Sequence, residues 1–269
     1  MADRDYVLGT HDDEIYRLGL QHRVWRTRVL DAWSRARIGE GATVIDFGAG
    51  PGFATMDLAD IVGPRGKVIA LERSQRFLNV LHAQAAARGH THVETHEVDF
   101  ATDTLPTANA DAAWVRWVFA FLPDPKPALQ KLVDALKPGG ALVIYEYFHY
   151  RSLGLTPASD SFDRFVDEVV ANWKGSGGDP DVGRFIPNWL CEMGLTLEST
   201  RPHIDLLSPR DPMWRWPESF FHLHIDRLLE LGRVTPDAAA AMREQFARDA
   251  AQPGALMATP LVMEIVARK

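Results

Sequence analysis

Three glycines separated by single residues are the feature of this sequence most able to do chemistry. Gly48, Gly50 and Gly52 follow a short apolar run, residues 43–47, in which Asp46 is the acid near the end. Glycine has no Cβ and tolerates positive φ, so a turn of this composition lets a ligand come into contact with the backbone. The segment predicts a strand, a tight turn and a helix N-terminus that together receive a nucleotide-like ligand.

Two further acids stand where later strands should end. Glu72 closes the apolar run 67–72, and Asp99, followed by Phe100, comes directly after the run 92–98. In nucleotide-binding α/β folds, an acid at the end of the second strand accepts hydrogen bonds from the ribose hydroxyls. These acids therefore predict a ligand that lies across the carboxyl ends of neighbouring parallel strands.

The remaining pattern supplies the elements that must position these residues. Apolar runs at 110–117 and 140–147 predict strands four and five, and the second of them is introduced by the turn 136–140, LKPGG. Apolar residues at helical spacing predict a long helix from about 14 to 35, with Thr10 as its N-cap. Strands that alternate with helices indicate a mostly parallel sheet with right-handed crossovers.

With these motifs in order, the chain resembles the class I S-adenosylmethionine (SAM)-dependent methyltransferases. The segment 46–52 is similar to their first motif, and 136–140 to the turn before their fifth strand. A nicotinamide dehydrogenase would usually show G-x-G-x-x-G in place of the G-x-G-x-G found here. The resemblance implies an α/β, Rossmann-like fold with a seven-stranded, mostly parallel sheet, an antiparallel last strand and helical lid insertions.

The resemblance also implies a single methyltransferase domain over residues 1–269. Its SAM-binding core and N-terminal cover helix would occupy 10–150, a substrate lid 151–258 and the last strand 259–269. A looser similarity, in residues 15–25 and 178–184, is to methyltransferases of small-molecule and quinone biosynthesis. In that group the N-terminal helix covers the methionine end of the cofactor.

SAM is accordingly the expected cofactor. The resemblance assigns the ribose to Glu72, adenine recognition to Asp99 and Phe100, and the methionine ammonium to Asp46. The full set of expected cofactor-binding residues is Tyr16, Gln21, Asp46, Gly48, Ala49, Gly50, Gly52, Glu72, Arg73, Asp99, Phe100, Arg116 and Trp117.

After residue 148 the sequence becomes rich in aromatic side chains. Helices are expected at 162–173, 183–193, 217–231 and 236–251, with a flexible glycine-rich loop at 174–181 and strands at 195–200 and 259–267. Such a segment predicts an apolar pocket for a small, aromatic or hydrophobic acceptor.

An oxygen acceptor would need a base. His149, at the tip of strand five, is the first choice for this catalytic role, before His222, His224 and Tyr147. For each of them a buried structural side chain is the alternative. Transfer to oxygen is favoured over transfer to carbon or nitrogen.

Composition limits the partners. The net charge of −7 and the absence of a basic stripe argue against nucleic acid, and no apolar window of membrane-spanning length occurs. The single cysteine fits a reducing compartment, and the N-terminus shows no signal peptide, so a cytoplasmic protein is expected. A small molecule is the expected partner, and a homodimer is compatible with the sequence.

Two histidine patterns have the composition of candidate metal sites. His92, Glu94 and His96 alternate along one predicted strand, but a solvated edge strand explains them as well. His222 and His224 are two residues apart on a predicted helix and cannot both hold one ion. No metal is therefore expected.

Two alternative functions remain open from the sequence. The same fold could hold SAM while catalysing a reaction without methyl transfer, such as a cyclisation. A nicotinamide oxidoreductase is the other rival. Release of S-adenosylhomocysteine (SAH) separates the first from a methyltransferase, and comparative titration with NADH and SAM separates the second.

Overall fold

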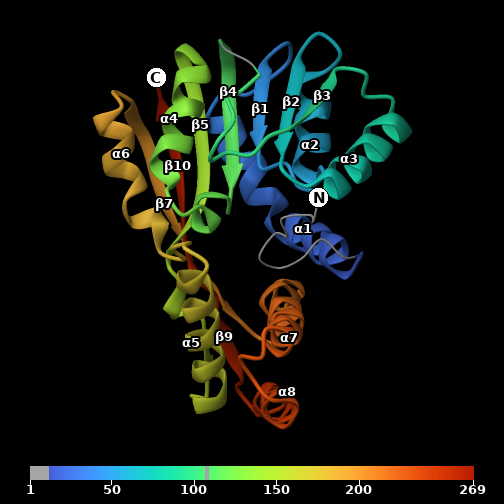
Figure 1. Cartoon of the computed structure of the whole chain (residues 1–269), viewed down its shortest axis with the longest axis vertical. Coiled ribbons are helices and arrows are strands. Elements are labelled where there is room, and N and C mark those ends of the chain that lie inside the picture. The colour runs from blue at the N-terminus through green and yellow to red at the C-terminus, as the bar shows by residue number, and fades with distance from the viewer. Residues whose placement is uncertain (1–11, 107–108) are drawn as a thin grey trace.

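The computed structural model describes residues 12–106 and 109–269, so the expected cap at Thr10 lies outside the described residues. Figure 1 shows a twisted sheet flanked by helices, and a helical lid that extends from one end of this sheet. The main sheet has the strand order β3-β2-β1-β4-β5-β10-β7. Strands β1 to β5 are parallel, whereas β10 runs antiparallel to both β5 and β7. The expected fold is confirmed.

The elements alternate along the chain as the sequence pattern predicts. The strands are β1 (Thr43–Phe47), β2 (Lys67–Glu72), β3 (Val93–Glu97), β4 (Ala110–Arg116), β5 (Leu136–His149), β6 (Gly154–Thr156), β7 (Thr196–His203), β8 (Leu206–Leu207), β9 (Leu256–Ala258) and β10 (Leu261–Arg268). The α-helices are α1 (Asp12–Arg35), α2 (Phe53–Val62), α3 (Gln75–Arg88), α4 (Pro125–Ala135), α5 (Asp160–Gly175), α6 (Ile186–Glu192), α7 (Arg215–Glu230) and α8 (Pro236–Ala250).

Both faces of the sheet are buried, which explains the continuous apolar runs of its central strands. Val44, Trp114 and Val143 face a core shared with α1 and α2, while Ile45 and Val115 face the core under α4 and α6. Successive side chains of a strand point to opposite faces, so each strand contributes to both cores. Because both faces of these strands are packed, the positions of the strand ends are fixed, and so are the positions of the residues that directly follow them.

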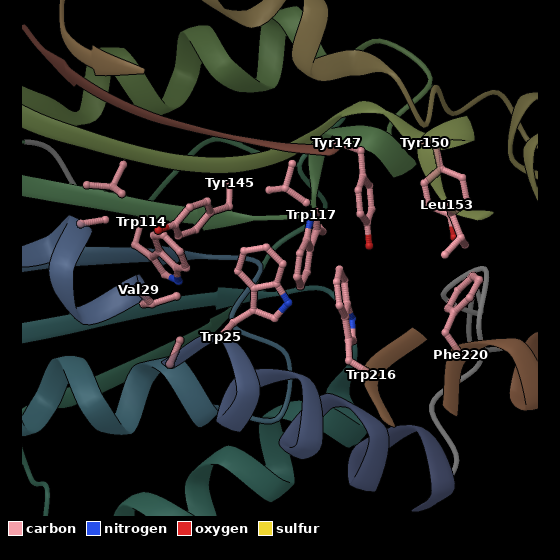
Figure 2. Packing of buried hydrophobic residues seen from close by; sticks show 14 of the residues in the cluster. Trp25, Val29, Trp114, Trp117, Tyr145, Tyr147, Tyr150, Leu153, Trp216 and Phe220 are labelled. Atoms are coloured by element: carbon pink, nitrogen blue, oxygen red, sulfur yellow. The ribbon is translucent and has the colours of Figure 1, made fainter. Parts of the chain in front are cut away.

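Helix α1 is docked by its tryptophans. Trp33 meets Trp114 edge-to-face with ring centroids 5.2 Å apart, and Trp25 meets Trp117 and Trp216 at 5.4 Å and 5.1 Å. Aromatic pairs in this geometry contribute about 0.5–1.5 kcal/mol each beyond area burial. Figure 2 shows Trp25 beside Trp117 and Trp216. The helix is therefore held against the carboxyl end of the sheet.

A buried carboxylate secures the same helix to β10. The Tyr145 hydroxyl donates to Glu264 at 2.6 Å, His203 lies 2.9 Å from the same carboxylate, and Arg35 of α1 forms an ion pair with it. Although burial opposes ionisation, these hydrogen bonds lower the pKa of Glu264 to about 2. The carboxylate thus remains charged and joins α1 to three strands, β5, β7 and β10.

The lid consists of α5, α7, α8 and three short strands, and it lies apart from the main sheet. In Figure 1, α5, α7 and α8 lie beyond the end of the sheet, next to β9. Phe162, Phe221 and Phe246 stack on one another in their common core. A small antiparallel sheet with the order β6-β9-β8 accompanies them and was not predicted, because its strands are only two or three residues long.

Two local predictions differ from the structure. The segment 136–140 was expected to be a turn, but β5 begins at Leu136, which pairs with Ala110 before a register shift. The helix expected at 183–193 is divided into a 3₁₀ turn, Val182–Arg184, and α6, because proline at 187 favours a new helix start. Within the described ranges, no helix is both long and apolar enough to cross a membrane.

Candidate active site

A cavity of about 370 Å³ lies at the carboxyl ends of β1, β2 and β4, where the strand order reverses direction. Open α/β sheets bind ligands at this switch point, and the volume falls within the range of small-molecule sites, about 300–1,000 Å³. It is lined by Leu18, Gln21, Asp46, Gly48, Ala49, Gly50, Pro51, Phe53, Ala54, Glu72, Arg73, Ser74, Phe77, Asp99, Phe100, Trp114, Arg116, Trp117, Val118, Phe121, Leu122, Pro123 and Ser176.

The structure thus brings together every expected cofactor residue except Tyr16 and Gly52. The residues that the sequence prediction missed are mostly neighbours of those it found. Ser74 follows Glu72 by two positions, and Val118 follows Trp117 directly. Their positions directly after β2 and β4 are the sequence signal that could have identified them as cavity residues.

The glycine turn is shaped by close packing on one side and open space on the other. Gly48 and Gly50 have φ of +79° and +56°, values that side chains rarely adopt. A Cβ on Gly48 would overlap Val118, whereas one on Gly50 would meet nothing within 4 Å. Gly52, with φ of +94°, is the N-cap of α2, and a Cβ on it would overlap Leu81. The turn therefore presents backbone to a ligand at Gly50.

Glu72 is held rigidly at the cavity wall. Its carboxylate accepts hydrogen bonds from the backbone N–H groups of Gly50, Arg73 and Ser74 at 2.9, 2.9 and 2.8 Å. Burial nevertheless raises the pKa of this carboxyl above its ordinary value. An oriented acid between two turns can accept further hydrogen bonds from a diol.

An aromatic side chain and an acid lie side by side in another part of the cavity lining. Phe100 is buried and stacks on Phe47, with ring centroids 3.9 Å apart and planes 26° apart. Asp99, beside it, is half-buried and accepts a hydrogen bond from the N–H of Ala101 at 3.0 Å. An apolar ring next to a carboxylate offers the contacts that a planar base with an exocyclic amine needs.

An acid and a cation occupy the inner end of the cavity. Asp46 is buried, accepts a hydrogen bond from the Thr55 hydroxyl at 2.6 Å, and has its pKa raised to about 6 by burial. Arg116 is likewise desolvated, which lowers its pKa to about 10, and its Nη1 has no hydrogen-bond partner among the described residues. A buried unpartnered guanidinium nitrogen is costly unless a ligand uses it. Together the two groups suit an amino-acid zwitterion.

A relay from α1 and α2 orients this arginine, and the sequence prediction missed it. The Arg116 Nη2 lies 3.4 Å from His22 Nδ1, and His22 Nε2 lies 3.0 Å from Asp57 Oδ2. Burial lowers the pKa of His22, so the ring is neutral at physiological pH. We assign the Nε2–H tautomer, in which His22 donates to Asp57 and accepts from Arg116. The relay joins residues 94 positions apart, so no local pattern reveals it.

Trp117 lines the cavity in a strained backbone conformation. Its φ of +52° is unusual for a bulky residue and marks a constrained turn after β4. Glu146 on β5 fixes this turn, because its Oε1 accepts from the N–H groups of Val118 and Phe119, both at 2.7 Å. The side chain of Glu146 is fully buried, and burial raises its pKa to about 8.

Helix α1 contributes to the cavity by one face only. Leu18 and Gln21 line the cavity, and Gln21 accepts hydrogen bonds from Arg17 at 2.9 Å and from Trp216 Nε1 at 3.1 Å. Tyr16 is 69% exposed and lies outside the cavity. Tyr16 and Gln21 are five positions apart on the helix, which places Tyr16 on another face, so its expected cofactor role is not supported.

His149 does not reach the cavity either. It is exposed, at the end of β5, where the chain turns into a 3₁₀ helix, Tyr150–Ser152. The inward positions of this segment are instead taken by Tyr147 and Tyr150, both buried. This placement argues against His149 as a general base, because a base must lie within hydrogen-bond reach of the acceptor.

The glycine-rich loop at 174–181 is packed rather than open. Gly178 leaves no room for a Cβ beside the Ala120 carbonyl, and Gly177 lies against Pro123. Ser176 reaches the cavity wall. The described residues contain no group of three His, Cys, Asp or Glu side chains that could hold a metal.

Comparison with known proteins agrees with this geometry. The model of a methyltransferase-domain family matches residues 44–140. The chain is 28% identical over 131 residues to the demethylmenaquinone methyltransferase of Lactococcus lactis, covering 48% of this chain and 50% of that protein. It is 27% identical over 186 residues to the ubiquinone/menaquinone biosynthesis C-methyltransferase UbiE of Vibrio cholerae, covering 68% and 65%. The chain thus spans between half and two thirds of these relatives.

Solved structures show the same fold. A putative methyltransferase from Bacillus halodurans superposes with a TM-score of 0.59 at 19% identity, covering 90% of this chain and 99% of that one. The [4+2]-cyclase SpnF superposes with a TM-score of 0.55 at 19% identity, covering 90% and 80%. At this identity the likeness concerns the fold alone.

The sheet order, the reversed strand β10 and the cavity at the switch point define a Rossmann-like α/β domain with a ligand site at the carboxyl edge of its sheet. The fold is that of the class I SAM-dependent methyltransferases, and residues 44–140 match a methyltransferase domain, for which SAM is the cofactor. In sequence the chain is similar to methyltransferases of quinone biosynthesis.

Proposed function

We propose that the protein transfers the methyl group of SAM to a planar, oxygen-substituted aromatic small molecule. The observation that carries this proposal is the position of Trp117, which lines the cavity and stacks between two other rings. Its ring lies 5.3 Å from Tyr147 and 5.5 Å from Trp216, with interplanar angles of 13° and 15°. Both faces of Trp117 are thus covered, and the polar cavity is bordered by the edge of an aromatic stack, against which a flat acceptor can pack edge-to-face.

The residues present fit SAM along its whole length. In our proposal the ribose is bound by Glu72 and the adenine lies by Asp99 and Phe100. The ammonium lies by Asp46, and the carboxylate takes the unpartnered Nη1 of Arg116. A charge-assisted hydrogen bond there would satisfy the buried guanidinium.

Bound SAM supplies an activated methyl group, so the protein has mainly to orient the acceptor and to exclude water. Trp117, Tyr147 and Trp216 would hold the ring, and Gln21 closes the same side from α1. No base at His149 is part of this scheme. An oxygen substituent makes both itself and the neighbouring ring carbon nucleophilic, and the relative from Vibrio cholerae is named a C-methyltransferase.

The direct test uses methyl-¹³C SAM and a panel of naphthols, naphthoquinols and their oxygen-free analogues. We expect SAH to form only with the oxygen-substituted members, with one ¹³C methyl in each product. The ¹³C chemical shift then separates an O-methyl from a C-methyl product. SAH release that does not depend on an acceptor, or no release with any of them, would contradict the proposal.

The same assay decides the cyclisation alternative. A SAM-dependent cyclase would convert its substrate without forming SAH, and SAM would remain intact. Fold similarity to SpnF does not favour that reaction, because the fold alone is shared.

Replacing Glu72 tests the cofactor assignment. Glu72→Ala is expected to weaken SAH binding by about 1–3 kcal/mol, because the ribose hydroxyls lose a charged acceptor. Titration calorimetry measures the effect. Glu97→Ala is the matched control, since Glu97 is the register partner of Glu72 on β3 but is exposed outside the cavity. Equal affinities for the two folded variants would refute ribose binding by Glu72.

A further inference from the structure

Arg116 brings a desolvated cation to the cavity lining, and no carboxylate of a described residue forms a hydrogen bond with it. Its guanidinium lies over the rings of Trp114 and Trp117, at 5.9 Å and 5.2 Å from their centroids. Asp46 acts on it only at longer range, and burial leaves its pKa at about 10, so it is charged at physiological pH. A desolvated charge is costly without a counter-charge, which a ligand in the cavity can supply.

A histidine separates this guanidinium from the carboxylate of Asp57. His22 Nδ1 lies 3.4 Å from Arg116 Nη2, and His22 Nε2 lies 3.0 Å from Asp57 Oδ2. On its other side Asp57 accepts a hydrogen bond from Nε of Arg26 at 2.7 Å, and Arg26 is exposed. The negative charge of Asp57 is therefore balanced by Arg26, and the positive charge of Arg116 remains available to a ligand.

A neutral imidazole in this place orients Arg116 without cancelling its charge. Burial lowers the pKa of His22, and with its proton on Nε2 the ring can only accept at Nδ1. One N–H of Arg116 Nη2 then has a fixed direction. Because the guanidinium is planar, its unpartnered Nη1 is fixed with it. A carboxylate in the position of the imidazole would instead pair with Arg116 and compete with the ligand.

We propose that His22 and Asp57 are positioning residues that make the site selective for nucleosides carrying an amino-acid carboxylate. They hold the Arg116 guanidinium toward the carboxylate of SAM or SAH, although neither of them lines the cavity. A similar ligand without this carboxylate leaves Arg116 unpaired and is rejected. This inference deepens the proposed function and rests on its placement of SAM.

Two ligands that differ only in the carboxylate test this selectivity without turnover. They are SAH and its decarboxylated analogue, which ends in a 3-aminopropyl group, and calorimetry measures both affinities. The wild type is expected to prefer SAH about a hundredfold, because the analogue leaves a desolvated guanidinium without its counter-charge. His22→Phe keeps a ring beside Phe53 but has no acceptor for Arg116, so the preference should fall to about tenfold through weaker SAH binding.

Two conservative variants and one spectrum distinguish positioning from packing. His22→Asn can place an acceptor oxygen on Cγ, where Nδ1 is attached, and should retain part of the preference. Asp57→Asn can present an amide N–H to His22 Nε2 and so favour the opposite tautomer, which should lower the preference as His22→Phe does. In the wild type, the ¹⁵N chemical shifts of His22 should show the proton on Nε2, and a proton on Nδ1 would overturn the assignment.

His92→Phe is the matched control. His92 also forms a hydrogen bond with α2, since its Nε2 lies 3.0 Å from the Ala59 carbonyl, but it does not line the cavity or contact Arg116. This variant should keep the wild-type preference. The preference is a ratio measured within one protein, so a general loss of stability cancels. An unchanged ratio in His22→Phe, including equal losses for both ligands, would refute the positioning role.

The wild type by itself tests the proposed function. A clear preference for SAH that no His22 or Asp57 variant alters would reject the positioning role and leave the placement of SAM intact. A wild type that binds both ligands equally, or that does not bind SAH, would instead contradict that placement.

Discussion

Gly48→Ala is expected to reduce SAH affinity at least a hundredfold. The backbone of Gly48 has φ of +79°, which costs a residue with a Cβ about 1–3 kcal/mol. The new methyl group would also overlap Val118 on the turn after β4. Both the glycine turn and the Val118 turn line the cavity, so the separation of its two walls must change. Calorimetry with SAH measures the loss.

Two further variants distinguish the effect of backbone strain at positive φ from that of steric overlap with Val118. Gly139→Ala carries the same φ of +79° but has no neighbour within 4 Å and does not line the cavity, so it should lower stability without changing SAH affinity. Val118→Ala in the Gly48→Ala background removes the overlapping methyl groups and should restore part of the affinity. Gly48→Ala binding SAH within tenfold of the wild type would disprove the assignment of this turn.

The parts of the site that the sequence predicted share one property. Asp46, Glu72 and Asp99 follow strands that can be recognised from short apolar runs, and the carboxyl ends of parallel strands meet at one edge. Gly48 and Gly50 are similarly local, because their spacing fixes the turn. Recognition of the strands was therefore sufficient to assemble this half of the site.

The parts that the sequence did not predict depend on the packing of distant elements. His22 meets Arg116 only because the tryptophans of α1 dock that helix on β4. The choice between Tyr16 and Gln21 depends on the rotation of α1, which helical spacing alone does not set. His149 is the last residue of β5, as predicted, but its side chain is exposed, and the sequence pattern does not set which side chains at the end of a strand face the cavity.

Glu146→Ala is expected to have the largest effect on stability among the variants considered. Its removal leaves the N–H groups of Val118 and Phe119 without their acceptor, and each unsatisfied buried donor costs about 1–3 kcal/mol. A loss of about 2–6 kcal/mol in the free energy of unfolding follows. Because Val118 lines the cavity and Trp117 is held in positive φ by the same turn, SAH affinity should fall with it. Urea unfolding and calorimetry measure the two effects.

Glu146→Gln is the conservative partner of this variant. Its side-chain carbonyl can accept from the same two N–H groups, so most of the stability and SAH affinity should be retained. Equal losses in Glu146→Ala and Glu146→Gln would show that the charge or proton of the carboxyl, and not its acceptor oxygen, stabilises the turn.

The pH dependence of stability distinguishes Glu146 from its amide. Burial raises the pKa of Glu146 to about 8 in the folded protein, against an ordinary value of 4.5. Below pH 4.5 the carboxyl is protonated in both states and no stability is lost. Between about pH 4.5 and 8 the unfolded chain releases this proton while the folded protein retains it, so stability falls by up to about 1.4 kcal/mol per pH unit. Glu146→Gln cannot titrate, and Asp46, whose pKa is about 6, is present in both proteins and cancels in their difference. Urea unfolding at pH 5.5, 6.5 and 7.5 should therefore show the wild type losing stability relative to Glu146→Gln as pH rises, and parallel curves would mean that this carboxyl is already ionised in the fold.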